Sequence, residues 1–226
     1  MSTVTAKDVK VLRDRTGAGM MDCKNALVEA GNDQEIAVEI IKKKGLAKAA
    51  KKAGAIAAEG VIHSYIHAGS RIGVLAEINC QTDFVSRNEE FTSLVDEIGL
   101  QIASSAPLYV RQSEVPPADI DAQNRIFVGQ IEEDEKKTGK KKPEQAVARI
   151  LEGKLNKWLN EVCLDNQELV TRDDKKTVEQ AFTELTARLG EKIHVRRFAR
   201  YELGEGIEVV KKDLAADVAE TLAKGA

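Results

Sequence analysis

An alternation of apolar and polar residues between positions 61 and 78 predicts a β-hairpin. In residues 71–78, every second side chain is apolar, which is the period of a strand with one buried face: Ile72, Val74, Ala76 and Ile78. Residues 61–67 form a second strand-like run. The connection between them, Ala68-Gly69-Ser70, contains the glycine that such turns favour.

Helical periodicity follows the hairpin. One apolar stripe recurs at intervals of three and four residues up to about Ser104, through Phe91, Leu94, Val95, Ile98 and Ile102. Ser86 and Glu89 have the spacing of a capping box and predict where this helix begins. Residues 108–111 then predict a further strand, and Pro116-Pro117 ends the β-β-α-β unit.

The first 54 residues are typical of short helices separated by glycines. Val9 and Leu12 begin an apolar face, and the last helix carries Ile36, Ile40 and Ile41. Lys42-Lys43-Lys44 followed by Gly45 predicts the end of that helix, because cations and glycine are both favoured there. These residues therefore predict a three-helix module, which the Ala/Lys-rich residues 47–58 join to the β-hairpin.

Two longer amphipathic helices are predicted over residues 119–138 and from Pro143 to about Val162. The short connection Thr138-Gly139-Lys140 makes them antiparallel neighbours. This spacing by itself favours a simple packed hairpin.

The last third of the chain predicts a helix over residues 177–189 and a strand over residues 192–201. Arg196-Arg197-Phe198 interrupts the alternation of that strand and predicts a β-bulge. The pattern of residues 210–223 predicts a short amphipathic helix that cannot bury its apolar stripe alone and needs a surface to pack on. The predicted fold class is α+β, with an antiparallel sheet core, packed helices, a helical hairpin and a C-terminal helix.

Composition limits the classes of function. The chain has 226 residues, 42% of them hydrophobic, and a net charge of -3, which argues against binding a bulk polyanion. Aromatic residues make up only 4%, so few side chains could stack on nucleotide bases. No apolar run approaches the roughly 20 residues of a membrane span, and residues 1–5 lack the form of a signal peptide. We expect a cytoplasmic protein that contacts neither membrane nor nucleic acid directly.

Cysteine and histidine positions indicate no metal site, cofactor or nucleophile. Cys23, Cys80 and Cys163 are too widely spaced for a metal site with a two-residue gap, and their odd number does not fit a disulfide framework. His63 and His67 are four residues apart on a predicted strand, so helical zinc-ligand spacing does not apply. We expect the three cysteines to have a structural role. A catalytic nucleophile formed by Cys80 and a histidine is the alternative that the sequence leaves open.

Thr82-Asp83-Phe84 lies where the predicted strand gives way to the helix. In one interpretation Phe84 fills the core and Asp83 stabilises the positive end of the next helix. In the other, a rigid junction projects an aromatic ring and a carboxylate outward as a wedge. Spacing alone leaves both interpretations open.

Two segments resemble the signature motifs of the elongation factor Ts family: residues 12–27 (LRDRTGAGMMDCKNAL) and residues 80–86 (CQTDFVS). The resemblance continues through Gly153-Lys154-Leu155, Lys157-Trp158, residues 191–201 and residues 204–208, and so covers nearly the whole chain. It implies a guanine-nucleotide exchange factor, with no chemistry of its own, that binds elongation factor Tu·GDP and promotes GDP release, so that GTP can rebind during translation elongation.

The resemblance also implies an organisation into five segments. These are a ubiquitin-associated-like module (residues 1–54), a core subdomain in two parts (55–118 and 164–205), a protruding coiled-coil hairpin for dimer or partner contacts (119–163) and a C-terminal module that packs on the partner (206–226).

The same resemblance implies which residues contact elongation factor Tu. Phe84 would insert between helices of the nucleotide-binding domain, with Thr82, Asp83 and Val85 beside it, and so displace the elements that hold magnesium. The N-terminal module would bind the same domain through Arg13, Met20 and Met21, with Lys24 nearby. We expect one of the two methionines to lie in the core of the module instead.

One segment departs from the family pattern. Residues 64–67 resemble a strand that, in long members, belongs to a second copy of the core unit and reaches toward the partner's phosphate-binding loop. Here they share a unit with Phe84, which implies a short form with a single core subdomain and leaves the role of His67 open. A single subdomain also suggests a homodimer or a two-plus-two complex. An interaction module without exchange activity, an RNA-binding protein and an independent enzyme are the competing classes.

Overall fold

Three antiparallel strands form the centre of the molecule. The computed structural model describes residues 4–207. The sheet has the order β1-β2-β3, with β1 at Glu59–Ile66, β2 at Ile72–Cys80 and β3 at His194–Glu202. The hairpin of β1 and β2 is confirmed, and the predicted inward face of β2 is buried at Val74, Ala76 and Ile78. The α+β fold class is confirmed as well.

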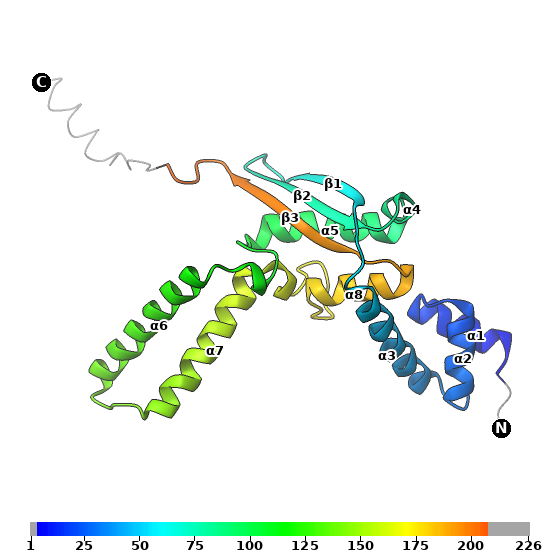
Figure 1. The fold of residues 1–226 in the computed structure, drawn as a ribbon, viewed down its shortest axis with the longest axis horizontal. Coiled ribbons are helices and arrows are strands. Elements are labelled where there is room, and N and C mark those ends of the chain that lie inside the picture. The colour runs from blue at the N-terminus through cyan, green and yellow to red at the C-terminus, as the bar shows by residue number, and fades with distance from the viewer. Residues whose placement is uncertain (1–3, 208–226) are drawn as a thin grey trace, which may run out of the picture.

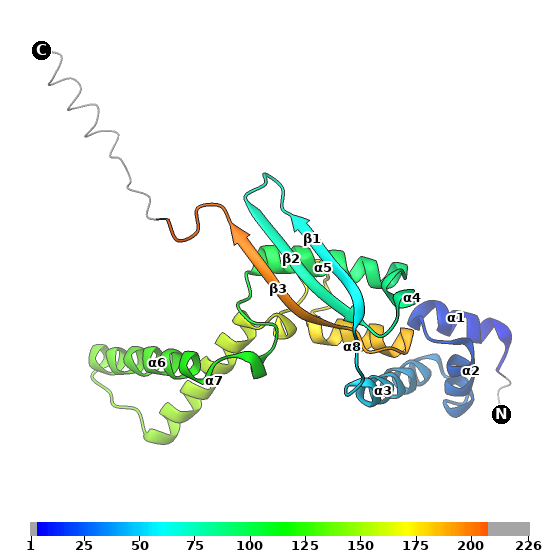
Figure 2. The same cartoon turned by 45° about the horizontal axis from the view of Figure 1, so that its top comes forward.

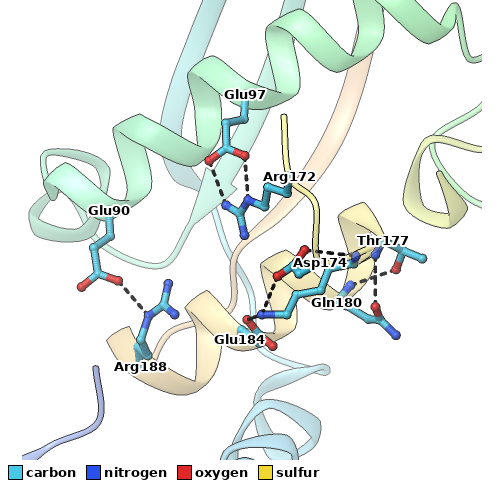
Figure 3. Close-up of polar contacts among 9 residues, drawn as sticks. Glu90, Glu97, Arg172, Asp174, Thr177, Gln180, Glu184 and Arg188 are labelled. Atoms are coloured by element: carbon cyan, nitrogen blue, oxygen red, sulfur yellow. Dashed lines mark hydrogen bonds and ion pairs between the residues drawn. The ribbon is translucent and has the colours of Figure 1, made fainter. Parts of the chain in front are cut away.

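Helix α5 (Glu89–Ser105) covers one face of the sheet, and α8 (Val178–Leu189) packs against α5 near the end of the sheet (Figure 1). Every residue of the predicted stripe from Phe91 to Ile102 is buried in the main core. Gly99 allows α5 to lie close to β1, because a Cβ atom there would stand 2.9 Å from the Cβ atom of Tyr65. Arg172, in the loop before α8, holds α5 with two hydrogen bonds of 2.8 Å to the carboxylate of Glu97 (Figure 3).

Helices α6 (Pro117–Thr138) and α7 (Glu144–Val162) form an antiparallel hairpin that extends away from the sheet (Figure 2). Prolines precede or open both helices, and Gly139 ends α6 in the left-handed conformation that glycine tolerates best. A small separate core, Val115, Leu159 and Cys163, lies at the root of the hairpin. The arm therefore protrudes, as the family resemblance implies, whereas its spacing alone favours a simple packed hairpin.

The N-terminal module contains α1 (Ala6–Thr16), α2 (Met20–Glu29) and α3 (Gln34–Lys52) around its own core. The predicted end of the last helix at Gly45 is wrong, because α3 continues for seven more residues. A Cβ atom on Gly45 would lie 3.1 Å from the Cβ atom of Ala187 in α8. The glycine thus permits a close approach of two helices and ends neither of them.

Two further local predictions are wrong. Residues 108–111 form no strand, and only an isolated bridge links Tyr109 to Cys163, so the third strand of the sheet is β3. Ser86 does not cap α5. It belongs to the short helix α4 (Asp83–Ser86), and the side chain of Asn88 accepts the capping hydrogen bond from the amide of Glu90.

The predicted irregularity in the last strand is confirmed. The pairing of β2 with β3 shifts register between Glu77 and Ile78, which leaves Arg196 as the extra residue. Arg196 and Arg197 both reach the carboxylate of Glu77, and these hydrogen bonds lower its pKa. The helix predicted over residues 210–223 lies outside the described residues.

Asp165 lies at the root of the hairpin, in the short helix η2 (Leu164–Asn166). Burial raises the pKa of this carboxyl from 3.8 to about 6, although the guanidinium of Arg111 lies 3.5 Å away and opposes the rise. Arg111 also donates to the carbonyl oxygen of Val195 at 2.8 Å, which ties the hairpin root to β3.

We predict that Asp165→Asn alters how stability depends on pH. The folded carboxyl keeps its proton up to about pH 6, whereas the unfolded one releases it near pH 4, so its stabilising effect is present below pH 4 and is lost as the pH rises to about 6. Urea unfolding measures the unfolding free energy of both proteins. Between about pH 4 and pH 6, the stability of the variant relative to the wild type should rise by up to roughly 3 kcal/mol. A difference independent of pH would contradict the assignment.

Candidate partner-binding site

Phe84 stands exposed on a four-residue helix directly after β2. Its side chain is 82% exposed, which excludes the interpretation in which it fills the core. The next residue, Val85, is buried in the main core and anchors the helix. Asp83 is also exposed and forms an ion pair of 3.1 Å with Arg87, one turn further along the chain. The junction therefore presents an aromatic ring and a carboxylate to solvent.

The carboxylate of Glu191 holds this junction in place. Glu191 follows α8 and accepts hydrogen bonds from the amides of Gln81 and Thr82, at 3.2 and 3.0 Å, and from the hydroxyl of Thr82 at 2.8 Å. In return, the side-chain oxygen of Gln81 accepts a hydrogen bond from the amide of Lys192 at 3.1 Å. The turn into α4 is thus fixed on the chain that enters β3.

Cys80 supports the same turn from inside the core. Its Sγ atom donates to the carbonyl oxygen of Thr82 at 3.1 Å. Burial raises the pKa of this thiol, so it keeps the proton that it donates. This geometry gives Cys80 a structural role and does not support a nucleophilic one.

The four residues expected to bind through the N-terminal module are all exposed: Arg13, Met20, Met21 and Lys24. The prediction that one methionine lies in the core is wrong, since the side chains of Met20 and Met21 are 58% and 64% exposed. The core of the module is filled instead by other apolar residues, with Leu12, Cys23 and Leu27 fully buried. Both methionines are therefore available to a partner.

The Phe84 junction and the exposed residues of the N-terminal module lie at the same end of the molecule. Figures 1 and 2 place α4 and the first two helices beyond the ends of α5 and α8. The sequence predicted these groups separately, and the fold brings them to one end.

His67 lies elsewhere. It follows the last residue of β1, whereas Cys80, at the end of β2, pairs with Glu59 at the start of β1. The eight residues of β1 span roughly 25 Å, at about 3.3 Å per residue. The side chain of His67 lies 3.1 Å from the hydroxyl of Tyr65. The structure therefore does not bring His67 together with Phe84.

Two residues of the site have no signal in the sequence. Glu191 holds Thr82 across 109 positions of the chain, and Arg188 holds Glu90 through an ion pair of 2.7 Å. Neither contact follows from periodicity or from a local motif. The resemblance already covered residues 191–201, but it assigned no role to Glu191.

Within residues 4–207, no group of three or more His, Cys, Asp or Glu side chains could hold a metal ion. All three cysteines are free and buried, and burial raises the pKa of each thiol. None of the described helices is long and apolar enough to cross a membrane.

Comparison with known proteins places the whole arrangement in a family. The family model described as "Elongation factor TS" matches residues 20–205, which include all three strands, the hairpin and Phe84. The chain belongs to the elongation factor Ts family. Membership makes it a factor of translation elongation in protein biosynthesis.

Curated elongation factor Ts proteins are similar over almost their entire length. The protein of Desulforamulus reducens is 51% identical over 219 residues, which are 97% of this chain and 98% of the relative. The protein of Myxococcus xanthus is 51% identical over 222 residues, 98% of this chain and 99% of the relative. That of Geobacter metallireducens is 48% identical over 217 residues, 96% and 97% of the two chains. Such coverage fits a short form of the elongation factor Ts family.

We predict that Glu191→Ala weakens the junction that carries Phe84. The change leaves the partly buried amides of Gln81 and Thr82 without their acceptor, which costs about 1–3 kcal/mol of unfolding free energy. Hydrogen exchange at these two amides should accelerate. The control is Glu152→Ala. Glu152 is an exposed residue of α7 that forms no ion pair within the described part of the chain. Unchanged exchange at residues 81 and 82 would show that Glu191 does not hold the turn.

Proposed function

We propose that this protein is a guanine-nucleotide exchange factor that binds elongation factor Tu·GDP and promotes the release of GDP, so that GTP can rebind. Membership of the elongation factor Ts family supports the partner. The observation that carries the proposal is the exposed ring of Phe84 on a fixed junction.

Exchange requires a protein that binds the nucleotide-free partner more tightly than the GDP-bound one. Each tenfold increase in GDP dissociation needs about 1.4 kcal/mol of such differential affinity. Because linkage is reciprocal, rebinding of nucleotide weakens the hold of the exchange factor by the same factor. The protein therefore acts by binding and carries out no chemistry of its own.

Phe84 supplies this differential affinity. Its ring inserts between helices of the partner's nucleotide-binding domain, into a space that is open only without nucleotide, and so displaces the elements that hold magnesium. Full burial of such a side chain stabilises a complex by roughly 1.5–3 kcal/mol. Asp83 adds polar contacts beside the ring, while Thr82 and the buried Val85 hold the short helix to the core.

The N-terminal module provides a second attachment to the same domain. Met20 and Met21 present flexible thioether side chains, which adapt to irregular apolar pockets. Arg13 and Lys24 add positive charge beside them. This attachment contributes affinity for every state of the partner, whereas Phe84 discriminates between the states.

We predict that Phe84→Ala slows stimulated GDP release roughly 10- to 100-fold at equal concentration, because the lost burial is worth about 1.5–3 kcal/mol. Stopped-flow release of a fluorescent GDP from elongation factor Tu measures the rate. Since the ring is exposed, the variant should unfold at the same urea concentration as the wild type.

The matched control is Leu108→Ala, which truncates another exposed apolar side chain beyond the opposite end of α5. It should release GDP as the wild type does. Equal stimulation by Phe84→Ala and the wild type would remove the wedge, and binding without any stimulation would leave an interaction module.

The outer face of the sheet supports a homodimer. Within residues 4–207, the elements that cover the sheet lie on one side, and the other side carries exposed apolar residues: Ile62, Ile66, Leu75 and Tyr201. Leu75 is 50% exposed although it lies on the central strand. Antiparallel sheets can stack face to face about 10 Å apart. The occupant we propose is the same face of a second copy.

A homodimer would also accommodate His67. It lies at the end of the hairpin far from Phe84, so one protomer does not present both residues in one compact site. Two protomers place two Phe84 rings and two His67 side chains on one assembly. That arrangement gives the two-plus-two complex with elongation factor Tu.

We predict that Leu75→Asp converts a dimer into a monomer, because it would bury charges between the two stacked sheets. Sedimentation velocity across a concentration series measures the change. Val170→Asp, which introduces the same charge at an exposed loop residue, should leave the dimer intact. A wild type that sediments as a monomer at every concentration would contradict the stacked-sheet arrangement.

A further inference from the structure

The end of α8 is the point where the N-terminal module meets the core. Helix α3 leaves the module and packs its second half against α8, with Gly45 opposite Ala187. Two of the smallest residues face each other there, so the two helices approach more closely than larger side chains would permit. The module is thus held by helix packing as well as by the chain that links it to β1.

Arg188, the next residue of α8, contacts both parts of the molecule. Its Cδ atom lies 2.9 Å from the position that a Cβ atom of Gly17 would occupy, just after α1. Its Nε atom forms an ion pair of 2.7 Å with Glu90 in the first turn of α5 (Figure 3). One side chain therefore bridges the module and the core.

The same short stretch of chain also holds the Phe84 junction. Three residues after Arg188, Glu191 accepts the three hydrogen bonds from Gln81 and Thr82. Glu90, the ion-pair partner of Arg188, lies six residues after Phe84. Residues 187–191 thus contact, in succession, α3, the end of α1, the start of α5 and the turn before α4.

We propose that residues 187–191 fix the N-terminal module and the Phe84 junction into one preformed binding face, and that Gly45 and Arg188 are positioning residues for it. The inference rests on the proposed function, since the face is the one that binds elongation factor Tu. Two attachments held at a fixed spacing bind together without the cost of ordering a loose linker. Neither positioning residue needs to touch the partner.

The test is Gly45→Leu in the full chain. A leucine there cannot fit against Ala187, so α3 should separate from α8 while the module and the core keep their own packing. Gly129→Leu is the matched control, because a Cβ atom at this helical glycine meets nothing within 4 Å.

Spin labels on the module and the core report the separation without any partner. Val28→Cys and Ser93→Cys place them on exposed positions of α2 and α5, and the native thiols are buried. Pulsed EPR should give one narrow distance distribution in the labelled wild type and Gly129→Leu. Gly45→Leu should give a broad one.

Exchange kinetics then show whether the spacing matters. Gly45→Leu should raise the half-saturating concentration for GDP release at least about tenfold, because the two attachments no longer bind as one. The rate at saturation should stay close to that of the wild type, since Phe84 is still present. Phe84→Ala should instead lower the rate at saturation.

If Gly45→Leu unfolds the chain, a smaller substitution and its compensating partner replace it in the test. Gly45→Ala alone places two Cβ atoms 3.1 Å apart, and adding Ala187→Gly removes one of them. The double variant should restore the narrow distribution and the half-saturating concentration. Arg188→Ala should broaden the distribution by removing the bridge.

Different outcomes separate this inference from the function on which it rests. A wild type that does not accelerate GDP release overturns the exchange function, whatever EPR shows. If the wild type is active, two results overturn the preformed face: an equally narrow distribution in a folded Gly45→Leu protein, or a broad one with unchanged half-saturation.

Discussion

Glu191 accepts three hydrogen bonds from the turn that leads into α4, and the direction of the Phe84 ring depends on them. An exposed ring on a loose loop would have to be ordered at each encounter, which costs free energy that binding must supply. Here the turn is held from one side by a carboxylate and from the other by the thiol of Cys80. The backbone that carries the ring is therefore already ordered before a partner arrives.

Much of the fold could be predicted from local pattern, and the reasons for the failures are physical. The alternation in β2 and the apolar stripe of α5 predict these elements correctly, because one face of each is buried against the same core. A glycine after lysines is typical of a helix end, yet the conformation of Gly45 is helical and its role is close packing. Residues 108–111 have strand-like composition, but the amides of Leu108 and Tyr109 donate to the carbonyl oxygen of Val162 at the hairpin root and pair with no strand of the sheet.

The candidate site was predictable only in part, because its supports come from distant positions. The motifs around Met20 and Phe84 stand out in the sequence, and the family resemblance implies that both contact a partner. The exposure of Phe84 could not be decided from spacing, since an aromatic after a strand is more often buried. Glu191 and Arg188 act across about a hundred residues, and a contact of that range leaves no periodic trace.

The contact of Gly45 with Ala187 has a consequence for how such sequences can diverge. At 3.1 Å, a methyl group added at position 45 is tighter than an ordinary contact, so the helices must move apart unless a methyl group is lost from position 187. The two positions should therefore change in a correlated way among related chains, with a small residue kept in at least one of them. A larger residue at one position alone would tilt the N-terminal module against the core. Selection would remove such a substitution even though no exposed residue had changed.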